Sequence, residues 1–343
     1  MKILFNLCKC GLGNNGGSQT IIRMASALHV LGHDVRILLD MPNRFTWFPV
    51  ERDILTFVDT DPNTWPKGDV IIATGCSTVT GTMAYSKLPL EKKFYWIRGF
   101  ETWAQSEEIL KGGYALGMNL LVNSEWQKRN IWRTTGHKAQ IQYSGLPIDE
   151  IYAHLNIDFK RSRLPLDHVN IGALYSKRDI KKFNVVLDVI RGLGHRVREF
   201  KTFGNDSTSG DNNLMNFFPR FCLPSNVIQP SFKHKISLMQ SCDIWLSTSV
   251  NDGLHIPPME AGLCGCNLVA MDMERSGVRD YAINDLTALT FLNVDEACEA
   301  VKQYCRDSGL RESHRANLQY TLVEKIGSVE KNAKRFEKIL CQV

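Results

Sequence analysis

Residues 241–272 read SCDIWLSTSVNDGLHIPPMEAGLCGCNLVAMD, a stretch in which short apolar runs alternate with polar segments. Residues 244–246 and 267–271 have the length and the apolar content of buried strands. The Pro-Pro pair between them predicts the start of a helix, since proline in the first turn sacrifices no intrahelical hydrogen bond. Gly265 predicts the end of that helix, because glycine adopts the left-handed conformation without penalty. The stretch therefore predicts a strand, a loop, a helix and a second strand.

Two acids lie at the mouth of this unit, Asp252 in the loop and Glu260 in the first turn of the predicted helix. Open parallel sheets bind ligands at the carboxyl ends of their strands, where this loop begins. Backbone N–H groups near residues 254–256 face the same mouth, and a helix start of this kind attracts phosphate. An ordinary β-α-β unit, with an acid favoured by the helix dipole, explains the same residues equally well.

Residues 252–261, DGLHIPPMEA, resemble the donor-site signature of retaining GT-B glycosyltransferases, in particular glycosyltransferase family four. That signature runs acid, Gly, aromatic, Gly, Leu, Pro, any, Leu, Glu, Ala. Asp252 stands in place of the usual first Glu, and His255 in place of the second Gly. The resemblance implies an α/β fold of the GT-B class, with two Rossmann-like domains whose parallel sheets face a central cleft. It also implies that Glu260 binds the ribose hydroxyls and Asp252 a hydroxyl of the donor sugar.

A basic turn at residues 176–182, SKRDIKK, extends the resemblance. In the family, a basic residue and a lysine five positions later clamp the donor diphosphate, and Lys177 and Lys182 have that interval. A register shifted by one residue, with Arg178 or Lys181 involved, stays open, and so does a solvated basic turn. Clustered cations suit a diphosphate, because negative charge grows on this leaving group as its bond to the sugar breaks.

The first forty residues predict a β-α-β opening with a glycine-rich loop after the first strand. Residues 11–16, GLGNNG, fit the Gly-x-Gly-x-x-Gly pattern of dinucleotide-binding proteins, and Asp40 is the acid about twenty residues later. A nicotinamide-dependent oxidoreductase is therefore an alternative. The resemblance favours the Gly-Gly loop of the GT-B N-terminal domain, with Gly16 and Gly17 in contact with substrate.

Further strands are predicted at residues 70–73, 94–98 and 120–122. Arg98 and Glu101 stand at the carboxyl end of the second of these strands, where they are candidates for binding a sugar or an acceptor. The remaining residues predicted to contact the donor are Ser249, Gly253, Leu254, His255, Ile256 and Gly277.

The length of 343 residues suits two domains of ordinary size. Residues 151–166 are polar and irregular, so we place the boundary there. The expected domains are residues 1–155 on the acceptor side and residues 165–325 as the nucleotide-sugar donor domain. By resemblance, a last helix at about residues 326–343 packs back on the first domain. Residues 213–228 are predicted to be a loop-rich crossover.

The composition is typical of a soluble globular protein, with 43% hydrophobic and 22% charged residues. No run of about eighteen apolar residues predicts a membrane span. Ten cysteines without framework spacing indicate reduced thiols and a cytoplasmic location. The pairs Cys8/Cys10 and Cys264/Cys266 lack partners at zinc-site spacing, so no metal is predicted. The net charge of +5 does not argue for a nucleic-acid partner.

Residues 126–133, WQKRNIWR, are both basic and aromatic. They predict an amphipathic helix whose basic face is either solvated or in contact with an anionic surface, a membrane or a phosphorylated acceptor. Peripheral membrane contact is therefore an open prediction.

These observations predict a retaining glycosyltransferase that moves a hexose or deoxyhexose from a nucleoside-diphosphate sugar to a glycan, lipid or protein-linked acceptor. Asp252, Glu260, Lys177 and Lys182 are the predicted catalytic group. No cofactor and no metal are expected, because lysines and a helix dipole supply the positive charge. A GT-B sugar-nucleotide epimerase is the nearest alternative, and the oxidoreductase is a more distant one.

Overall fold

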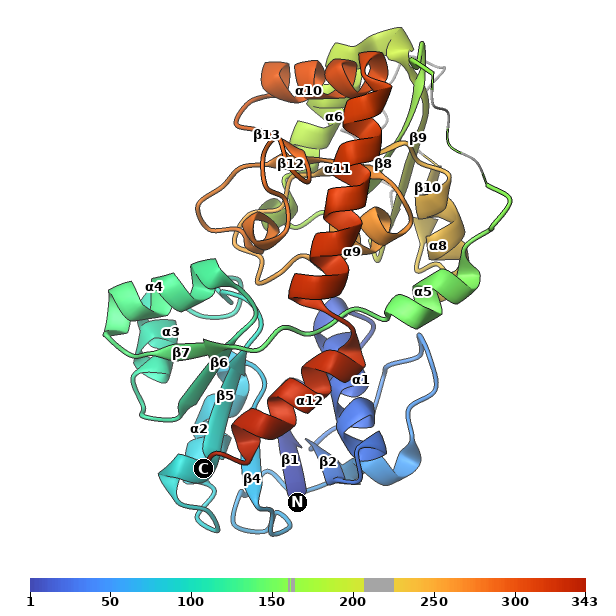
Figure 1. Cartoon of the computed structure of the whole chain (residues 1–343). Helices are drawn as coiled ribbons and strands as arrows, with labels where there is room; N and C mark the ends of the chain where they lie inside the picture. The colour runs from blue at the N-terminus through green and yellow to red at the C-terminus, as the bar shows by residue number, and fades with distance from the viewer. Residues whose placement is uncertain (160, 162–163, 207–224) are drawn as a thin grey trace. The chain divides into compact units, whose positions relative to one another are not determined.

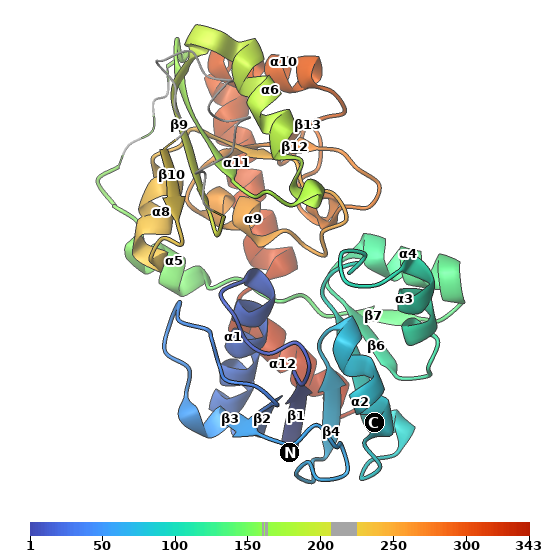
Figure 2. The ribbon, with the colours of Figure 1, turned by 180° about the vertical axis from the view of Figure 1, so that it is seen from behind.

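A computed structural model describes residues 1–159, 161, 164–206 and 225–343, and these form two compact units. Unit 1 consists of Met1–Gly145 together with Ser328–Val343, and unit 2 is Leu146–Gly327. Each unit contains a parallel sheet with helices packed against it (Figure 1, Figure 2). The predicted α/β class is therefore confirmed.

The sheet of unit 1 has seven parallel strands in the order β3-β2-β1-β4-β5-β6-β7. Its strands are β1 (Lys2–Asn6), β2 (Asp34–Leu39), β3 (Leu55–Phe57), β4 (Val70–Ala73), β5 (Lys93–Ile97), β6 (Asn119–Val122) and β7 (Ala139–Ile141). Its helices are α1 (Gly16–Val30), α2 (Val79–Ala84), α3 (Glu107–Tyr114), α4 (Glu125–Thr135) and α12 (Val329–Leu340). The order reverses between β1 and β4, so the loops that follow these two strands diverge and leave room for a ligand.

The last helix, α12, packs on α1 in unit 1, and both views show the two helices side by side (Figure 1, Figure 2). The Phe336 ring lies 6.2 Å from the Phe5 ring and 5.3 Å from the Trp96 ring, centroid to centroid. Both partners belong to central strands, so α12 contributes directly to the core of unit 1. Edge-on aromatic packing of this kind stabilises a core beyond simple area burial.

Gly145 is the last residue of unit 1 before the chain enters unit 2, and its φ is +73°. A Cβ atom there would lie 2.6 Å from the Cα atom of Val329, where the chain returns into α12. Only glycine combines this backbone conformation with so close an approach of two chain segments.

The sheet of unit 2 has six parallel strands among the described residues, in the order β10-β9-β8-β11-β12-β13. They are β8 (Val169–Leu174), β9 (Val197–Gly204), β10 (Ser225–Ile228), β11 (Ile244–Ser247), β12 (Asn267–Met271) and β13 (Leu289–Phe291). The helices are α5 (Ile148–His154), α6 (Phe183–Leu193), α8 (Phe232–Gln240), α9 (Ile256–Leu263), α10 (Val294–Arg306) and α11 (Ser308–Thr321), the last continued by a π-helical turn (Leu322–Ile326).

Two predictions about unit 2 are wrong in part. The crossover predicted at residues 213–228 ends in strand β10, which pairs with β9; residues 213–224 lie outside the described residues. The segment predicted to be irregular from residue 151 begins inside helix α5, because Ile148 and Ile151 are buried and anchor one face of that helix. A short strand and a short helix carry too few residues for a clear hydrophobic period.

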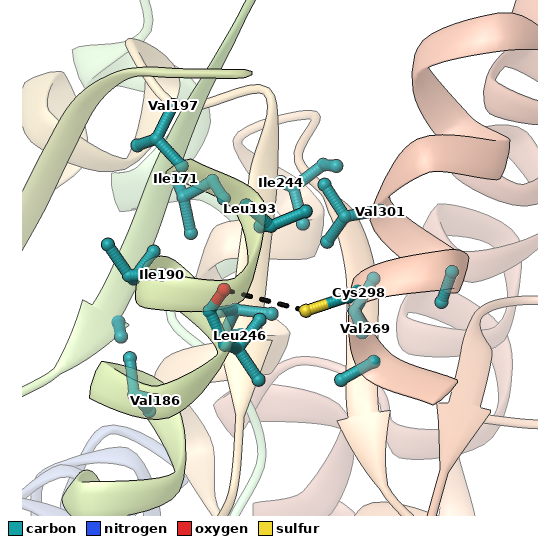
Figure 3. Packing of buried hydrophobic residues seen from close by; sticks show 14 of the residues in the cluster. Ile171, Val186, Ile190, Leu193, Val197, Ile244, Leu246, Val269, Cys298 and Val301 are labelled. Carbon is teal, nitrogen blue, oxygen red and sulfur yellow. Dashed lines mark hydrogen bonds between the residues drawn. The ribbon is translucent and has the colours of Figure 1, made fainter. Parts of the chain in front are cut away.

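The core of unit 2 lies between the sheet and the helices α6 and α10, and the side chains labelled around Cys298 in Figure 3 are aliphatic. Cys298 of α10 faces α6 there, and its thiol donates to the carbonyl oxygen of Val189 at 3.6 Å. A buried thiol of this kind behaves as a small apolar side chain. The labelled residues around it are Ile171, Val186, Ile190, Leu193, Val197, Ile244, Leu246, Val269 and Val301.

No helix in the described part of the chain has both the length and the apolar character needed to cross a bilayer.

Candidate functional site

The strand order of unit 2 reverses between β8 and β11, and the loops after these two strands are the predicted basic turn and the predicted acidic loop. The hydroxyl of Thr248 donates to the carbonyl oxygen of Lys181 at 2.7 Å. The amide of Val250 donates to the carbonyl oxygen of Ile180, also at 2.7 Å. The fold therefore brings together two segments that are about seventy residues apart in the sequence, as in other doubly wound sheets.

Lys181 and Asp252 form an ion pair at this point, with Nζ 2.5 Å from Oδ2. Their side chains are 15% and 16% exposed, so the pair is largely shielded from water but can still be reached from outside. Burial acts to raise the pKa of Asp252, but the Lys181 ammonium and hydrogen bonds from Lys181 and Ser249 outweigh it and lower the pKa below its usual value. Asp252 is therefore ionised at neutral pH.

The backbone supports the shifted register of the basic turn. Lys182 has φ +47°, a conformation that glycine adopts freely, and in the family the residue after the clamping lysine is glycine. This backbone conformation therefore favours the register in which Lys181 corresponds to that lysine. Ser176 stands five positions earlier, so the interval to a first basic residue is not kept. Lys177 has an exposed side chain, and its backbone amide donates to Asp206 at 2.8 Å.

His255 is buried at the start of α9 with φ +56°, which explains why glycine is usual at this position of the signature. Its imidazole lies 3.1 Å from the hydroxyls of both Ser247 and Ser249. The hydroxyl of Tyr281 donates to its carbonyl oxygen at 2.9 Å. Burial, with the Lys181 ammonium close by, lowers the pKa of His255 to about 3, so the ring is neutral and acts as a rigid spacer beside Asp252.

We expect this histidine to make the protein less stable in mild acid. The unfolded chain takes up a proton near pH 6.5, whereas folded His255 does not until about pH 3, so stability falls as the pH drops through this window. Between pH 7 and pH 5 the loss through His255 is about 2 kcal/mol. Urea unfolding at the two pH values measures it. His255→Asn, which tolerates positive φ, should show a drop smaller by this amount, and an unchanged pH dependence would contradict the prediction.

Gly277 closes the other side of the acidic loop. Its amide donates to the carbonyl oxygen of Asp252 at 3.2 Å, and a Cβ atom at Gly277 would lie 1.9 Å from the carbonyl oxygen of Gly253. The hydroxyl of Ser276 donates to the carbonyl oxygen of Ser249 at 3.3 Å. The glycine turn therefore fixes the backbone that carries Asp252.

The helix start itself differs from the prediction. Helix α9 begins at Ile256, and its first turn contains no acid, so the placement of Glu260 in the first turn is wrong. Pro257 and Pro258 occupy that turn and have no N–H group, so the helix offers fewer donors to an anion than expected. The side chain of Leu254 is buried.

Glu260 lies one turn further in and is 2% exposed. Its carboxylate pairs with the Lys235 ammonium of α8, with Oε1 2.7 Å from Nζ. Lys235 was not identified from the sequence, since it belongs to no motif and stands 25 residues before its partner.

Two of the residues of unit 1 that were predicted to bind substrate, Arg98 and Glu101, form hydrogen bonds within the unit itself. The Arg98 guanidinium donates to the carbonyl oxygens of Gly17 and Thr74, both at 2.5 Å, and so ties the start of α1 to the end of β4. Glu101 accepts a hydrogen bond from the amide of Cys76 at 2.5 Å, at the start of a helical turn. A Cβ atom at Gly17 would lie 3.1 Å from the Arg98 guanidinium, so glycine permits this contact. A Cβ atom at Gly16 would meet nothing within 4 Å.

Asp40, the acid that kept the oxidoreductase alternative open, accepts from the amide of Lys9 with both carboxylate oxygens at 3.0 Å. It therefore closes the β1–α1 loop. Among the described residues, the cysteines of the two Cys-x-Cys pairs join no group of metal ligands, and His29, Glu51 and Asp53 are the residues close enough to share an ion.

No protein-family model and no curated protein matches the chain in sequence. Solved structures do match in fold. HepE of Anabaena in complex with UDP and glucose is 14% identical with a TM-score of 0.76, and the match covers 100% of both chains. Sucrose-phosphate synthase of Thermosynechococcus elongatus is 11% identical with a TM-score of 0.78, over 100% of this chain and 98% of that one. A glycosyltransferase of Rickettsia africae is 14% identical with a TM-score of 0.72, over 99% and 98%. The chain therefore has the GT-B fold, with two Rossmann-like units.

Proposed function

We propose that this protein is a glycosyltransferase that transfers a sugar from a nucleoside-diphosphate donor to an acceptor, with retention of the anomeric configuration. The observation that carries the proposal is the contact between Lys181 and Asp252 at the strand-order reversal of unit 2. It joins the basic turn and the acidic loop that resemble the two halves of a donor site. HepE, which shares the fold, binds UDP and glucose.

In this proposal Lys181 leaves Asp252 and binds the diphosphate when the donor enters. The ammonium then stabilises the charge that grows on the leaving group, which is the largest electrostatic demand of the transition state. Asp252 is ionised without a donor and accepts a hydrogen bond from a hydroxyl of the transferred sugar. Glu260 contacts the ribose.

Lysine charge supplies the electrostatic stabilisation in this scheme, and we propose that turnover needs no divalent metal. Assays with and without a chelator test this part: equal rates support it, and a loss that magnesium restores would contradict it.

Thermal-shift measurements with nucleoside diphosphates and sugar nucleotides test the proposal as a whole, since a ligand that binds only the folded state raises Tm. Release of the nucleoside diphosphate is then measured with candidate glycan and lipid acceptors, and NMR of the product reports its anomeric configuration. Stabilisation by one donor, followed by acceptor-dependent release, is the expected result. An isomerised sugar nucleotide without acceptor would indicate an epimerase, and binding of a nicotinamide cofactor instead would indicate an oxidoreductase.

The acceptor side of the proposal includes contact with an anionic membrane through α4 of unit 1. This helix buries Trp126 and Ile131, whereas Lys128, Arg129 and Trp132 are exposed, the last at 61%. Trp132 lies four residues after Lys128 and three residues after Arg129, so both cations are neighbours of the indole on the helix surface. Two cations beside an exposed indole suit the surface of a bilayer that contains anionic lipid.

We expect the wild-type protein to bind vesicles with anionic lipid and not vesicles of neutral lipid. The double variant Lys128→Gln/Arg129→Gln should bind about 30-fold more weakly, since each cation near the surface contributes about 1 kcal/mol. Lys334→Gln/Arg335→Gln changes the charge equally on the exposed face of α12 and serves as the control. Vesicle flotation measures both, and equal losses in the two variants would contradict a role for α4.

A further inference from the structure

The ion pair between α8 and α9 in unit 2 is a second unusual feature of the donor half. The Lys235 ammonium lies 2.7 Å from Oε1 of Glu260, and the two side chains are 12% and 2% exposed. Lys235 stands in the first turn of α8, and its ammonium also lies over the Phe232 ring, 4.7 Å from the centroid. Taking two charges out of water is unfavourable, so a buried pair is by itself weak evidence for a role in stability.

The pair leaves hydrogen-bonding capacity open. An ammonium has three N–H donors and a carboxylate has two acceptor oxygens. The contact with Oε1 uses one donor and one acceptor. Among the described residues, no N–H or hydroxyl group donates to Oε2 of Glu260, and no oxygen atom accepts from the remaining N–H groups of Lys235. The two side chains therefore present a donor and an acceptor next to each other.

The pair also lies near the edge of the sheet where a ligand is expected. Helix α8 follows β10 and helix α9 follows β11, and a helix that follows a strand of a parallel sheet starts near the carboxyl ends of the strands. Lys235 is in the first turn of its helix and Glu260 in the second turn of the next, so both stand close to this edge. Asp252 and Lys181 lie in loops at the same edge.

A ribose hydroxyl donates one hydrogen bond and accepts another, which matches a carboxylate beside an ammonium. We propose that Lys235 is a specificity-determining residue that, together with Glu260, recognises the ribose of the donor. Glu260 accepts from the 2′-hydroxyl, and Lys235 donates to the same oxygen. This inference rests on the proposed function, in which Glu260 contacts the ribose, and it adds a partner residue and a preference for ribonucleotides.

The preference follows from what a deoxyribonucleotide lacks. Without the 2′-hydroxyl, both charged groups lose a hydrogen bond in a site that the bound nucleotide shields from water. Hydrogen bonds to charged groups contribute about 1.5–3 kcal/mol each. Because two such bonds are lost, we expect a nucleoside diphosphate to bind at least about 100-fold more tightly than its 2′-deoxy counterpart.

Calorimetric titration tests the preference for ribose. The ligands are UDP, ADP, GDP and CDP, followed by the 2′-deoxy form of each nucleotide that binds. The wild-type preference should fall by about 10- to 100-fold in Lys235→Met, through weaker binding of the ribonucleotide and little change for the deoxynucleotide, since only the former loses the Lys235 contact while its contact with Glu260 remains. Lys233→Met removes an exposed lysine from the same helix and should keep the full preference.

The outcomes separate the two proposals. If no nucleoside diphosphate binds, the proposed function fails. If one binds but the wild-type protein does not distinguish ribose from deoxyribose, or Lys235→Met keeps the preference, the role of Lys235 fails and the pair only joins two helices. The wild-type ratio tests recognition of the 2′-hydroxyl without a variant, and Lys235→Arg tests the role of Lys235 if Lys235→Met is unstable. Lys235→Arg, which keeps the charge, should retain part of the preference.

Discussion

Replacing Lys181 with methionine is expected to lower kcat/KM for sugar transfer by about 100- to 1,000-fold, the usual result of removing one preplaced group that stabilises charge in a transition state. The side chain keeps its length and loses its charge. Most of the loss should appear in kcat, because the diphosphate gains charge as the glycosidic bond breaks and Lys181 acts mainly at that stage. Initial rates across a range of donor concentrations separate the two parameters.

The same experiment decides the register of the basic turn. Lys182→Met removes the neighbouring cation, whose φ of +47° marks it as the residue in the glycine position. If Lys182→Met lowers kcat more than Lys181→Met does, the predicted pairing of Lys177 with Lys182 is right and the contact between Lys181 and Asp252 is not part of the donor site. Lys233→Met controls for the loss of a surface charge, and circular dichroism confirms that each variant is folded.

Gly277→Ala is expected to lower the free energy of unfolding by about 2–4 kcal/mol and to weaken donor binding at least about 10-fold. The added Cβ atom would lie 1.9 Å from the carbonyl oxygen of Gly253, which no rotation of a side chain can relieve. The backbone must therefore move, and it carries Asp252. Urea unfolding measures the first effect, and calorimetric titration of the donor measures the second.

Gly309→Ala provides the matched control for this substitution. Gly309 also belongs to unit 2, but a Cβ atom there would meet its nearest neighbour, Oδ1 of Asp307, at an ordinary 3.4 Å. Its stability and donor affinity should stay close to those of the wild-type protein. If Gly277→Ala behaves in the same way, the glycine turn does not hold the acidic loop.

The elements that the sequence predicted well are those with a strong local signal. The strands at residues 70–73 and 267–271 appear with the predicted bounds, because apolar runs specify them without help from distant residues. Helix α9 starts one residue earlier than its Pro-Pro pair suggested. Proline is tolerated anywhere in the first turn, where its missing N–H group has no intrahelical partner, so the pair does not mark the first residue, and the earlier start moves Glu260 out of the first turn.

The contacts between distant segments could not be predicted in the same way. The partner of Asp252 depends on a backbone shift of one residue at Lys182, and spacing alone does not show which of two adjacent lysines has positive φ. The partner of Glu260 comes from a helix with no motif. Arg98 was predicted to bind substrate, but its two terminal nitrogens contact carbonyl oxygens of Gly17 and Thr74, which only the folded sheet places beside it.

The return of α12 to unit 1 has a consequence for how the protein is made. Unit 2 is one uninterrupted segment, so all of it is synthesised before the last helix of unit 1. Until then the core of unit 1 lacks Phe336 and the apolar residues beside it, and the surfaces of Phe5 and Trp96 that face α12 stay uncovered. Although unit 1 begins the chain, its core can therefore be completed only after all of unit 2 has been synthesised.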